Sequence, residues 1–205
     1  MSKSEQENEV KFYLRDMNSV ASRLQAAGAR LTDQRVLETN LRFDTVDNKL
    51  GRAGQVLRLR QDSRSLLTYK GPGRPGESVS MRQEIEFQVS DFESARHFLE
   101  ALGYRVGIIY EKYRTTYDLD GLMVTLDEMP FGSFMEIEGP DADSIKAAAE
   151  KLHLDWEARS TLSYLAIFSQ LSRARGLSIP NLTFEGLKDV HATPQDLGLR
   201  YADAL

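Results

Sequence analysis

Charged side chains stand at every second position along several segments of this chain, and their types are those that bind phosphates and divalent cations. Arg58 and Arg60 flank a leucine, and Glu136 and Glu138 flank an isoleucine. In an extended strand, residues two apart point to the same face, so each pair shares a face. Arginine offers phosphate a bidentate fork, lysine offers a point charge, and carboxylate oxygens bind Mg²⁺ beside substrate phosphates. Together they indicate a site for a metal–polyphosphate complex.

The same alternation recurs on seven predicted strands. Basic residues that could hold a polyanion are Arg58, Arg60, Lys70, Arg82, Lys112 and Arg114. Carboxylates that could hold hard cations are Glu7, Glu9, Glu84, Glu86, Asp127, Glu136 and Glu138. For any single strand, a solvated sheet face is the better explanation of such a pattern. Its recurrence, and the apolar residues on the opposite faces, favour a sheet that curls around a charged interior.

The elements that must position these residues form an α+β pattern, because runs of adjacent strands are broken by helices. Strands are predicted at about 5–15, 29–45, 55–61, 65–70, 80–89, 104–118, 122–128 and 132–139. Helices are predicted at about 16–27, 91–102, 141–152 and 160–172. The helices are amphipathic and can cover the apolar face of a mainly antiparallel sheet. Residues 173–205 have a weaker pattern and are predicted to be a partly helical extension.

Composition narrows the classes of function. The 205 residues fit one domain, or one domain with an appendage, and contain no cysteine, which excludes disulfides, iron–sulfur clusters and thiol nucleophiles. The three histidines are too far apart in sequence for a helical zinc-protease motif. A net charge of −5 disfavours nucleic acid as a partner. The polar N-terminus and the lack of long apolar runs predict a cytoplasmic protein with no membrane partner.

Several short motifs follow one another in a recognisable order. They are Glu7-x-Glu9-x-Lys11, Phe43-Asp44-Thr45, Leu57-Arg58-Leu59-Arg60, Thr68-Tyr69-Lys70-Gly71-Pro72, Arg82-x-Glu84-x-Glu86, Glu111-Lys112-x-Arg114, Asp127 and Glu136-x-Glu138. This ordered set resembles the CYTH superfamily, the triphosphate tunnel metalloenzymes. The family includes class IV adenylyl cyclases, thiamine triphosphatases and inorganic triphosphatases. The resemblance covers about residues 5–172 and leaves out the extension 173–205.

The resemblance implies an eight-stranded antiparallel β tunnel, closed or nearly closed, within a domain of residues 1–172. It implies one or two Mg²⁺ or Mn²⁺ ions on the carboxylates. Metal candidates are Glu7, Glu9, Glu136, Glu138 and Asp127, while Glu84 and Glu86 are open between metal ligands and counter-ions of arginines. Phosphate candidates are Lys11, Arg58, Arg60, Lys70, Arg82, Lys112 and Arg114. Of these, Lys11, Arg58, Arg60, Lys112 and Arg114 are expected to act in catalysis by stabilising charge as the bond breaks.

Three functions remain open at the level of sequence. We favour hydrolysis of inorganic triphosphate, thiamine triphosphate or ATP over cyclisation of ATP to cyclic AMP and pyrophosphate. Binding of triphosphate or polyphosphate without turnover is a third possibility, although a pure anion binder has little use for so many carboxylates. The chain is expected to be a monomer or a homodimer. Trp156 and Tyr164 are interpreted as packing residues beside the last helix.

Overall fold

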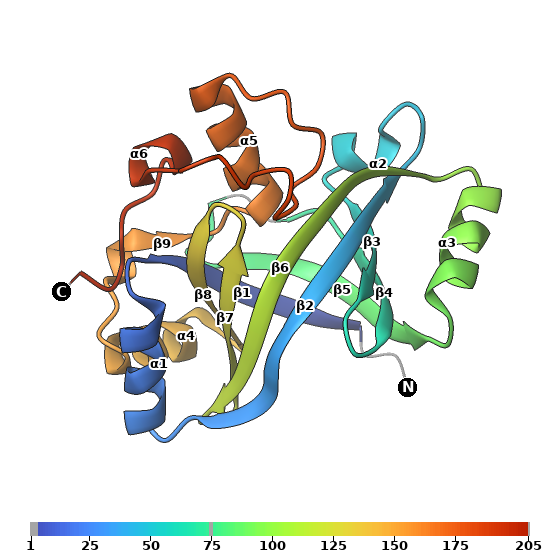
Figure 1. Cartoon of the computed structure of the whole chain (residues 1–205). Helices are drawn as coiled ribbons and strands as arrows, with labels where there is room; N and C mark the ends of the chain where they lie inside the picture. The colour runs from blue at the N-terminus through green and yellow to red at the C-terminus, as the bar shows by residue number, and fades with distance from the viewer. Residues whose placement is uncertain (1–3, 74–75, 205) are drawn as a thin grey trace.

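The charged alternation becomes a ring of antiparallel strands in the computed structural model, which describes residues 4–73 and 76–204 (Figure 1). Within those residues the ring strands are β1 (Ser4–Leu14), β2 (Arg30–Asp44), β3 (Val56–Gln61), β4 (Ser65–Lys70), β5 (Ser80–Val89), β6 (Arg105–Leu119), β7 (Leu122–Met129) and β8 (Gly132–Gly139). The predicted boundaries agree with these to within about two residues at nearly every end. Residues 1–3 of the predicted domain lie outside the described residues, as do Arg74 and Pro75 of the loop before β5.

The ring closes at β1, which pairs with β8 on one side and with β5 on the other. The order around it is β5-β4-β3-β2-β6-β7-β8-β1, and all of these pairings are antiparallel. Register fixes which charges meet, since Glu9 lies opposite Glu138 and Glu7 lies opposite Arg82. The predicted eight-stranded antiparallel tunnel is thus confirmed for the part of the chain that the structure describes.

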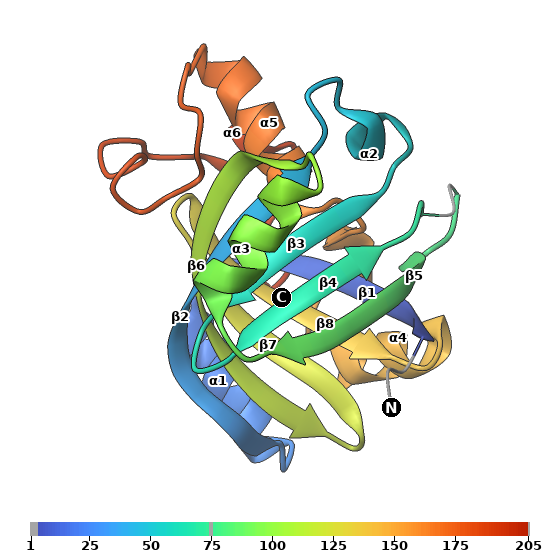
Figure 2. The same cartoon turned by 90° about the vertical axis from the view of Figure 1, so that its right-hand side faces the viewer.

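Helices pack outside the ring, as predicted (Figure 2). They include α1 (Met17–Ala26), α3 (Phe92–Ala101) and α4 (Ala142–Lys151). Each begins after an aspartate whose carboxylate accepts a hydrogen bond from the backbone N–H three residues later. The apolar faces of α1 and α4 share one core cluster with β1, β7 and β8, whereas α3 joins a second cluster on β2 and β3. No helix in the described ranges has the length and apolarity needed to span a bilayer.

Some elements differ from the sequence prediction. The last long helix, α5, runs over Tyr164–Arg175 rather than 160–172, because Arg159–Ser160 forms the short strand β9 on β1. Ser163 is the N-cap of α5, and Gly176, with a φ of 63°, ends it. Between β2 and β3, where no element is predicted, the chain forms one helical turn, α2 (Lys49–Arg52). The backbone N–H groups of Leu50 and Gly51 in this turn donate to the carboxylate of Asp44.

The C-terminal extension packs against the ring instead of leaving it. Leu182 pairs with β6 through two backbone hydrogen bonds, donating to Ile109 and accepting from Glu111, each 2.9 Å long. Near the end of the chain, Tyr201 stacks on Tyr13 of β1 with ring centroids 4.8 Å apart. A short helix, α6 (Pro194–Leu197), lies between Leu182 and Tyr201 in the sequence and contributes to the core cluster around α5. The predicted boundary at residue 172 therefore falls inside α5, and the division into domain and extension stays a prediction.

Candidate active site inside the ring

The ring encloses a cavity of about 820 Å³ whose lining is mostly charged. All of the predicted site residues line it except Asp127, which lies behind the cavity wall. The strands alternate in direction and the side chains alternate in face, so predicted site residues from six strands that are distant in sequence converge here. What the sequence did not predict is how the charges are distributed around the ring.

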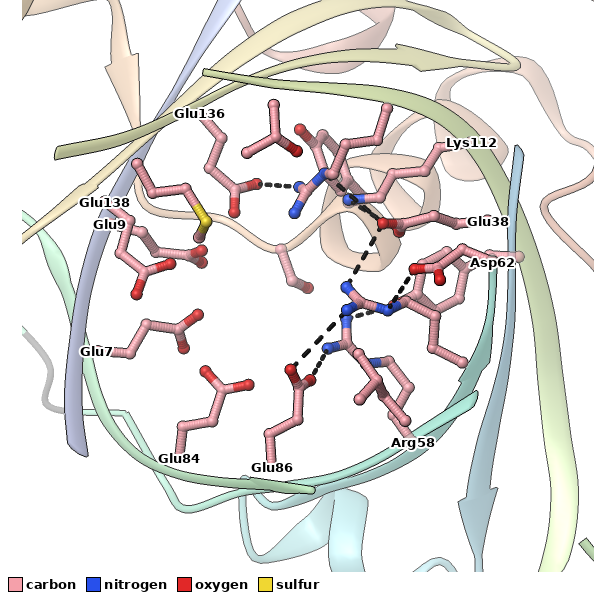
Figure 3. A pocket seen from close by; sticks show the side chains of 18 of the residues that line it. Glu7, Glu9, Glu38, Arg58, Asp62, Glu84, Glu86, Lys112, Glu136 and Glu138 are labelled. Carbon is pink, nitrogen blue, oxygen red and sulfur yellow. Dashed lines mark hydrogen bonds and ion pairs between the residues drawn. The ribbon is translucent and has the colours of Figure 1, made fainter. Parts of the chain in front are cut away.

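Acidic side chains gather on β1, β5 and β8, along one side of the cavity (Figure 3). Glu7, Glu9, Glu84 and Glu138 point toward a common space in this view. Burial first, and then Glu7, Glu136 and Glu9, raise the pKa of Glu138 to about 8. Burial and the neighbouring Glu136 likewise raise the pKa of Glu9. These shifts show that the carboxylates are crowded and lack enough positive charge nearby.

Two lysines supply part of that positive charge. Lys11 Nζ lies 2.7 Å from Glu9 Oε1 and 3.3 Å from Glu136 Oε2. Lys70 Nζ lies 2.5 Å and 2.6 Å from the two carboxylate oxygens of Glu7. Burial opposes the charge on each lysine, yet the surrounding carboxylates outweigh it and raise both pKa values. Both lysines are therefore positively charged members of the acidic side.

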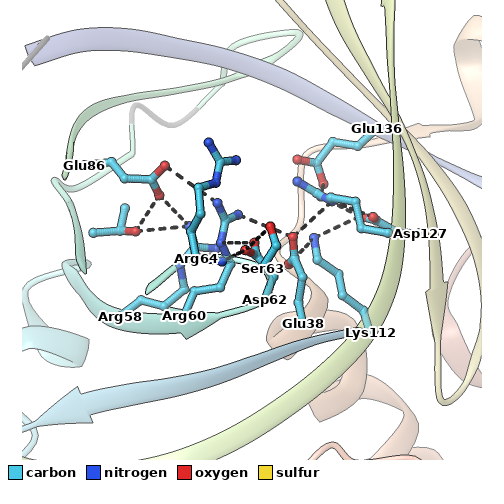
Figure 4. Close-up of polar contacts among 12 residues, drawn as sticks. Glu38, Arg58, Arg60, Asp62, Ser63, Arg64, Glu86, Lys112, Asp127 and Glu136 are labelled. Carbon is cyan, nitrogen blue, oxygen red and sulfur yellow. Dashed lines mark hydrogen bonds and ion pairs between the residues drawn. The ribbon is translucent and has the colours of Figure 1, made fainter. Parts of the chain in front are cut away.

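The opposite side of the cavity carries most of the cations, with a buried glutamate among them (Figure 4). Glu38 is 2% exposed and lies 3.4 Å from both Arg60 Nη1 and Lys112 Nζ. Burial opposes the ionisation of Glu38, but Lys112, Arg114 and Arg60 lower its pKa to about 2. The carboxylate holds three cationic side chains in one group. This group faces the acidic side across the cavity except at Arg114, whose Nη2 lies 3.5 Å from Glu136 Oε2.

Asp127, behind the cavity wall, also pairs with cations of the basic side. Its carboxylate is fully buried and accepts hydrogen bonds from Lys112 Nζ at 3.1 Å and from two nitrogens of Arg114 at 2.6 and 2.7 Å. The hydroxyl of Tyr164, the first residue of α5, donates a further bond of 2.7 Å. These donors engage both oxygens of Asp127. The metal role predicted for Asp127 stays a prediction, and its contacts are those of a counter-ion.

The sequence leaves the role of Glu86 open between a metal ligand and a counter-ion, and in the structure its ion pairs are with arginines. Its carboxylate accepts from Thr68 at 2.7 Å and pairs with Arg58 Nη2 at 3.3 Å. Burial opposes ionisation, while Arg60 and Arg58 lower its pKa. Glu84, by contrast, pairs with Lys70 at 3.1 Å on the acidic side. The two glutamates of one motif thus belong to different sides of the cavity.

A divalent cation suits the acidic side by the chemistry of the donors. Five carboxylates line that side: Glu7, Glu9, Glu84, Glu136 and Glu138. Carboxylate oxygens are the ligands that Mg²⁺ and Mn²⁺ prefer, and a divalent cation would relieve the crowding that raises the pKa of Glu138. Within the part of the chain that the structure describes, no group of three or more such side chains is already arranged to hold a metal ion. The residues fit the metal in type and charge, and Lys11 and Lys70 pair with four of the five carboxylates, all but Glu138.

Sequence reasoning overlooked several residues of the cavity. They include Glu38 and Arg42 on β2, Tyr110 on β6 and Tyr164 on α5. The β2 pair follows the same two-residue alternation as the residues that were found, so that signal was present in the sequence. Tyr110 and Tyr164 had no such signal, because a buried tyrosine looks like a packing residue until its hydroxyl partner is known. Tyr164 does pack, and its ring also lies 5.3 Å from Lys11 Nζ and 5.5 Å from Lys112 Nζ.

Comparison with protein families matches residues 5–162 to the family described as the CYTH domain. A protein of Methanocaldococcus jannaschii named "Putative adenylate cyclase MJ0240" is 27% identical over 139 residues, covering 67% of this chain and 78% of the relative. These matches span the strands that carry the charged cavity.

Solved structures share the fold. A Vibrio parahaemolyticus protein described as a "putative adenylate cyclase" has a TM-score of 0.71 at 23% identity, covering 82% of this chain and 99% of its own. A Hippeastrum protein described as a "putative adenylyl cyclase" with a dominant triphosphatase activity has a TM-score of 0.62 at 21% identity, covering 80% and 95%.

Proposed function

The chain belongs to the CYTH family, and on that premise we propose that it is a metal-dependent enzyme that hydrolyses a triphosphate inside the ring. The observation that carries this proposal is the division of one cavity into a carboxylate side and an arginine–lysine side. A metal–triphosphate complex has the matching charges, since its cation seeks carboxylates and its phosphate oxygens seek guanidinium and ammonium groups. The substrate would lie between the two sides.

On the acidic side, the metal would be held by carboxylates of Glu7, Glu9, Glu84, Glu136 and Glu138. When bound, Mg²⁺ or Mn²⁺ neutralises these groups, polarises phosphoryl oxygens and lowers the pKa of a bound water. On the other side, Arg58, Arg60, Lys112 and Arg114 bind and orient the phosphate chain. They also stabilise the negative charge that develops as the phosphoanhydride bond breaks. In this proposal Glu38 and Asp127 hold three of those four cations in place.

Cyclisation of ATP is the second candidate, because a relative at 27% identity is named as an adenylate cyclase. The same cations would then bind the phosphates while the ribose 3′-hydroxyl attacks the α-phosphorus and pyrophosphate leaves. Hydrolysis is favoured because the cavity lining is dominated by charged groups that suit a phosphate chain. The dominant triphosphatase activity of the Hippeastrum protein agrees with that preference.

A product assay separates the candidates. Purified protein is given inorganic triphosphate, ATP or thiamine triphosphate with Mg²⁺ and, separately, with Mn²⁺, and phosphate, pyrophosphate and cyclic AMP are resolved. We expect orthophosphate and no cyclic AMP. Cyclic AMP with stoichiometric pyrophosphate would replace hydrolysis with cyclisation, and tight binding without any product would replace both with a binding role.

Variants link the activity to the cavity. Glu138→Gln removes one carboxylate from the acidic side and is expected to raise the Mn²⁺ concentration for half-maximal activity by about tenfold or more, the loss of one charged ligand. Glu100→Gln is the matched control, because Glu100 on α3 pairs with Arg96 and both residues lie outside the cavity lining. Equal metal dependence in the two variants would remove the acidic side from the mechanism.

A further inference from the structure

Lys70 occupies an unusual place for a residue that is expected to bind phosphate. It is the last residue of β4, and its ammonium group contacts both carboxylate oxygens of Glu7 and one oxygen of Glu84 at 3.1 Å. Its side chain is 14% exposed. The ammonium group thus bridges two carboxylates of the acidic side, which is the position that a small cation would take between them.

Lys11 differs from Lys70 in how it is held. Lys11 is the more deeply buried of the two, and the ring of Tyr164 lies 5.3 Å from its Nζ. Lys70 stands at a strand end, directly before the loop that leads to β5. A flexible four-carbon stem at a strand end can move its charge without moving the sheet. Of the two lysines, Lys70 is the one that can leave its carboxylates.

We propose that Lys70 is a built-in counter-ion that competes with the divalent cation for Glu7 and Glu84. The inference rests on the proposed metal site and adds a role that phosphate binding alone does not require. A metal that binds these carboxylates must first break the pairs with Lys70. Charge-assisted hydrogen bonds to a buried carboxylate are among the stronger ones, so this competition weakens metal binding when no triphosphate is present.

The chain offers a close control. Arg82 lies directly opposite Glu7 in the β1–β5 pairing and lines the same cavity. Its Nε has no hydrogen-bond partner, and no carboxylate within the described ranges forms an ion pair with it. Removing Arg82 therefore takes one positive charge from the neighbourhood of Glu7 without freeing a carboxylate. Comparing the Arg82 and Lys70 variants therefore separates direct competition for the carboxylates from a general change in electrostatic potential.

The experiment titrates Mn²⁺ alone, with no phosphate compound, and follows free Mn²⁺ by electron paramagnetic resonance. Lys70→Met is expected to bind Mn²⁺ about tenfold more tightly than the wild type, the gain from one strong charge-assisted pair that no longer has to break. Lys70→Gln serves as a second neutral variant, and circular dichroism verifies that each variant is folded. Lys70→Arg keeps the charge and should bind no more tightly than the wild type.

Each result is decisive. Tighter binding in the neutral Lys70 variants, with a smaller gain in Arg82→Met, supports direct competition. Equal gains in the Lys70 and Arg82 variants, or no gain in either, would overturn the competition while leaving the metal site intact. If neither the wild type nor any variant binds Mn²⁺, the metal site itself fails and the competition fails with it.

Discussion

At the scale of single residues, the basic side of the cavity depends on one buried carboxylate, that of Glu38. Glu38 brings together Arg60, Lys112 and Arg114, which would otherwise repel one another. A buried charge is tolerated only when it is paired, so Glu38 and these cations stabilise one another. The charges that would bind phosphate are therefore positioned before any ligand arrives.

Glu38→Gln should destabilise the protein by about 3–5 kcal/mol at pH 7, since breaking a buried charged pair leaves the partner charges uncompensated. The cost should depend on pH. The pKa of Glu38 is about 2 in the folded protein against an ordinary value of 4.5, so its stabilising effect is complete above about pH 4.5 and fades as the pH falls toward 2.

Urea unfolding of wild type and Glu38→Gln across that pH range measures the effect. The difference in unfolding free energy should shrink as the pH falls. Glu77→Gln, an exposed glutamate on the loop before β5, is the control and should change stability by less than about 0.5 kcal/mol. A constant difference from pH 7 to 2 would show that Glu38 acts through its shape and not its charge.

At the scale of elements, α5 contributes to the cavity wall and the C-terminal extension packs against α5. Ser163, Tyr164 and Leu165, at the start of α5, belong to the cavity lining. The extension in turn packs on α5 through Leu182, Leu187 and Leu197 and continues to β6. The family match ends at residue 162, so both segments are outside it, although the start of α5 lines the cavity.

Leu182→Ala tests how firmly the extension is attached. Leu182 is fully buried, so the substitution should cost about 2–5 kcal/mol through lost burial and a residual cavity. Leu31→Ala is the control, because Leu31 is 47% exposed and should cost about 0.5 kcal/mol or less. Thermal unfolding gives the stability, and amide hydrogen exchange at Glu111 and Leu182, the two donors, reports on the backbone pairing with β6. Similar costs in the two variants would mean that the extension contributes little to stability.

At the scale of the whole molecule, the protein has a net charge of −5, and its ring encloses one cavity lined by both acidic and basic side chains. Closing the sheet brings β5 beside β1 and so places the carboxylates of both strands together. A ligand that contacts both sides of the cavity links strands from the whole ring. Binding should therefore stabilise the entire fold and not one local segment.

Mn²⁺ and inorganic triphosphate together should raise Tm more than either alone, and excess EDTA should reverse the increase. Ligand at a hundred times its Kd stabilises the folded state by about 2.7 kcal/mol. Differential scanning fluorimetry measures the shift, with initial scans completed before appreciable turnover. The double variant Glu136→Gln, Glu138→Gln is the control and should lose most of the Mn²⁺-dependent part. An unchanged shift in that variant would place the metal elsewhere.

Much of this protein could be predicted from its sequence. Two-residue alternation identified the strands and the residues that face the interior, because the period of a β-strand depends only on local backbone geometry. Polar caps and apolar stripes located three of the helices for the same reason. The ordered motifs identified the family and named most of the charged residues that line the cavity, but not Asp33, Arg35, Glu38, Arg42, Asp62 and Arg64.

Only the tertiary structure decided how these residues combine. The acidic and basic sides are separate because ring closure places β1 between β5 and β8. Which strands become neighbours when the ring closes cannot be predicted from the local sequence of either strand. The same closure pairs Lys70 with Glu7, 63 residues away. The buried roles of Glu38, Asp127 and Tyr164 depend on partners in other elements, since a charge is a ligand or a counter-ion only in relation to what surrounds it.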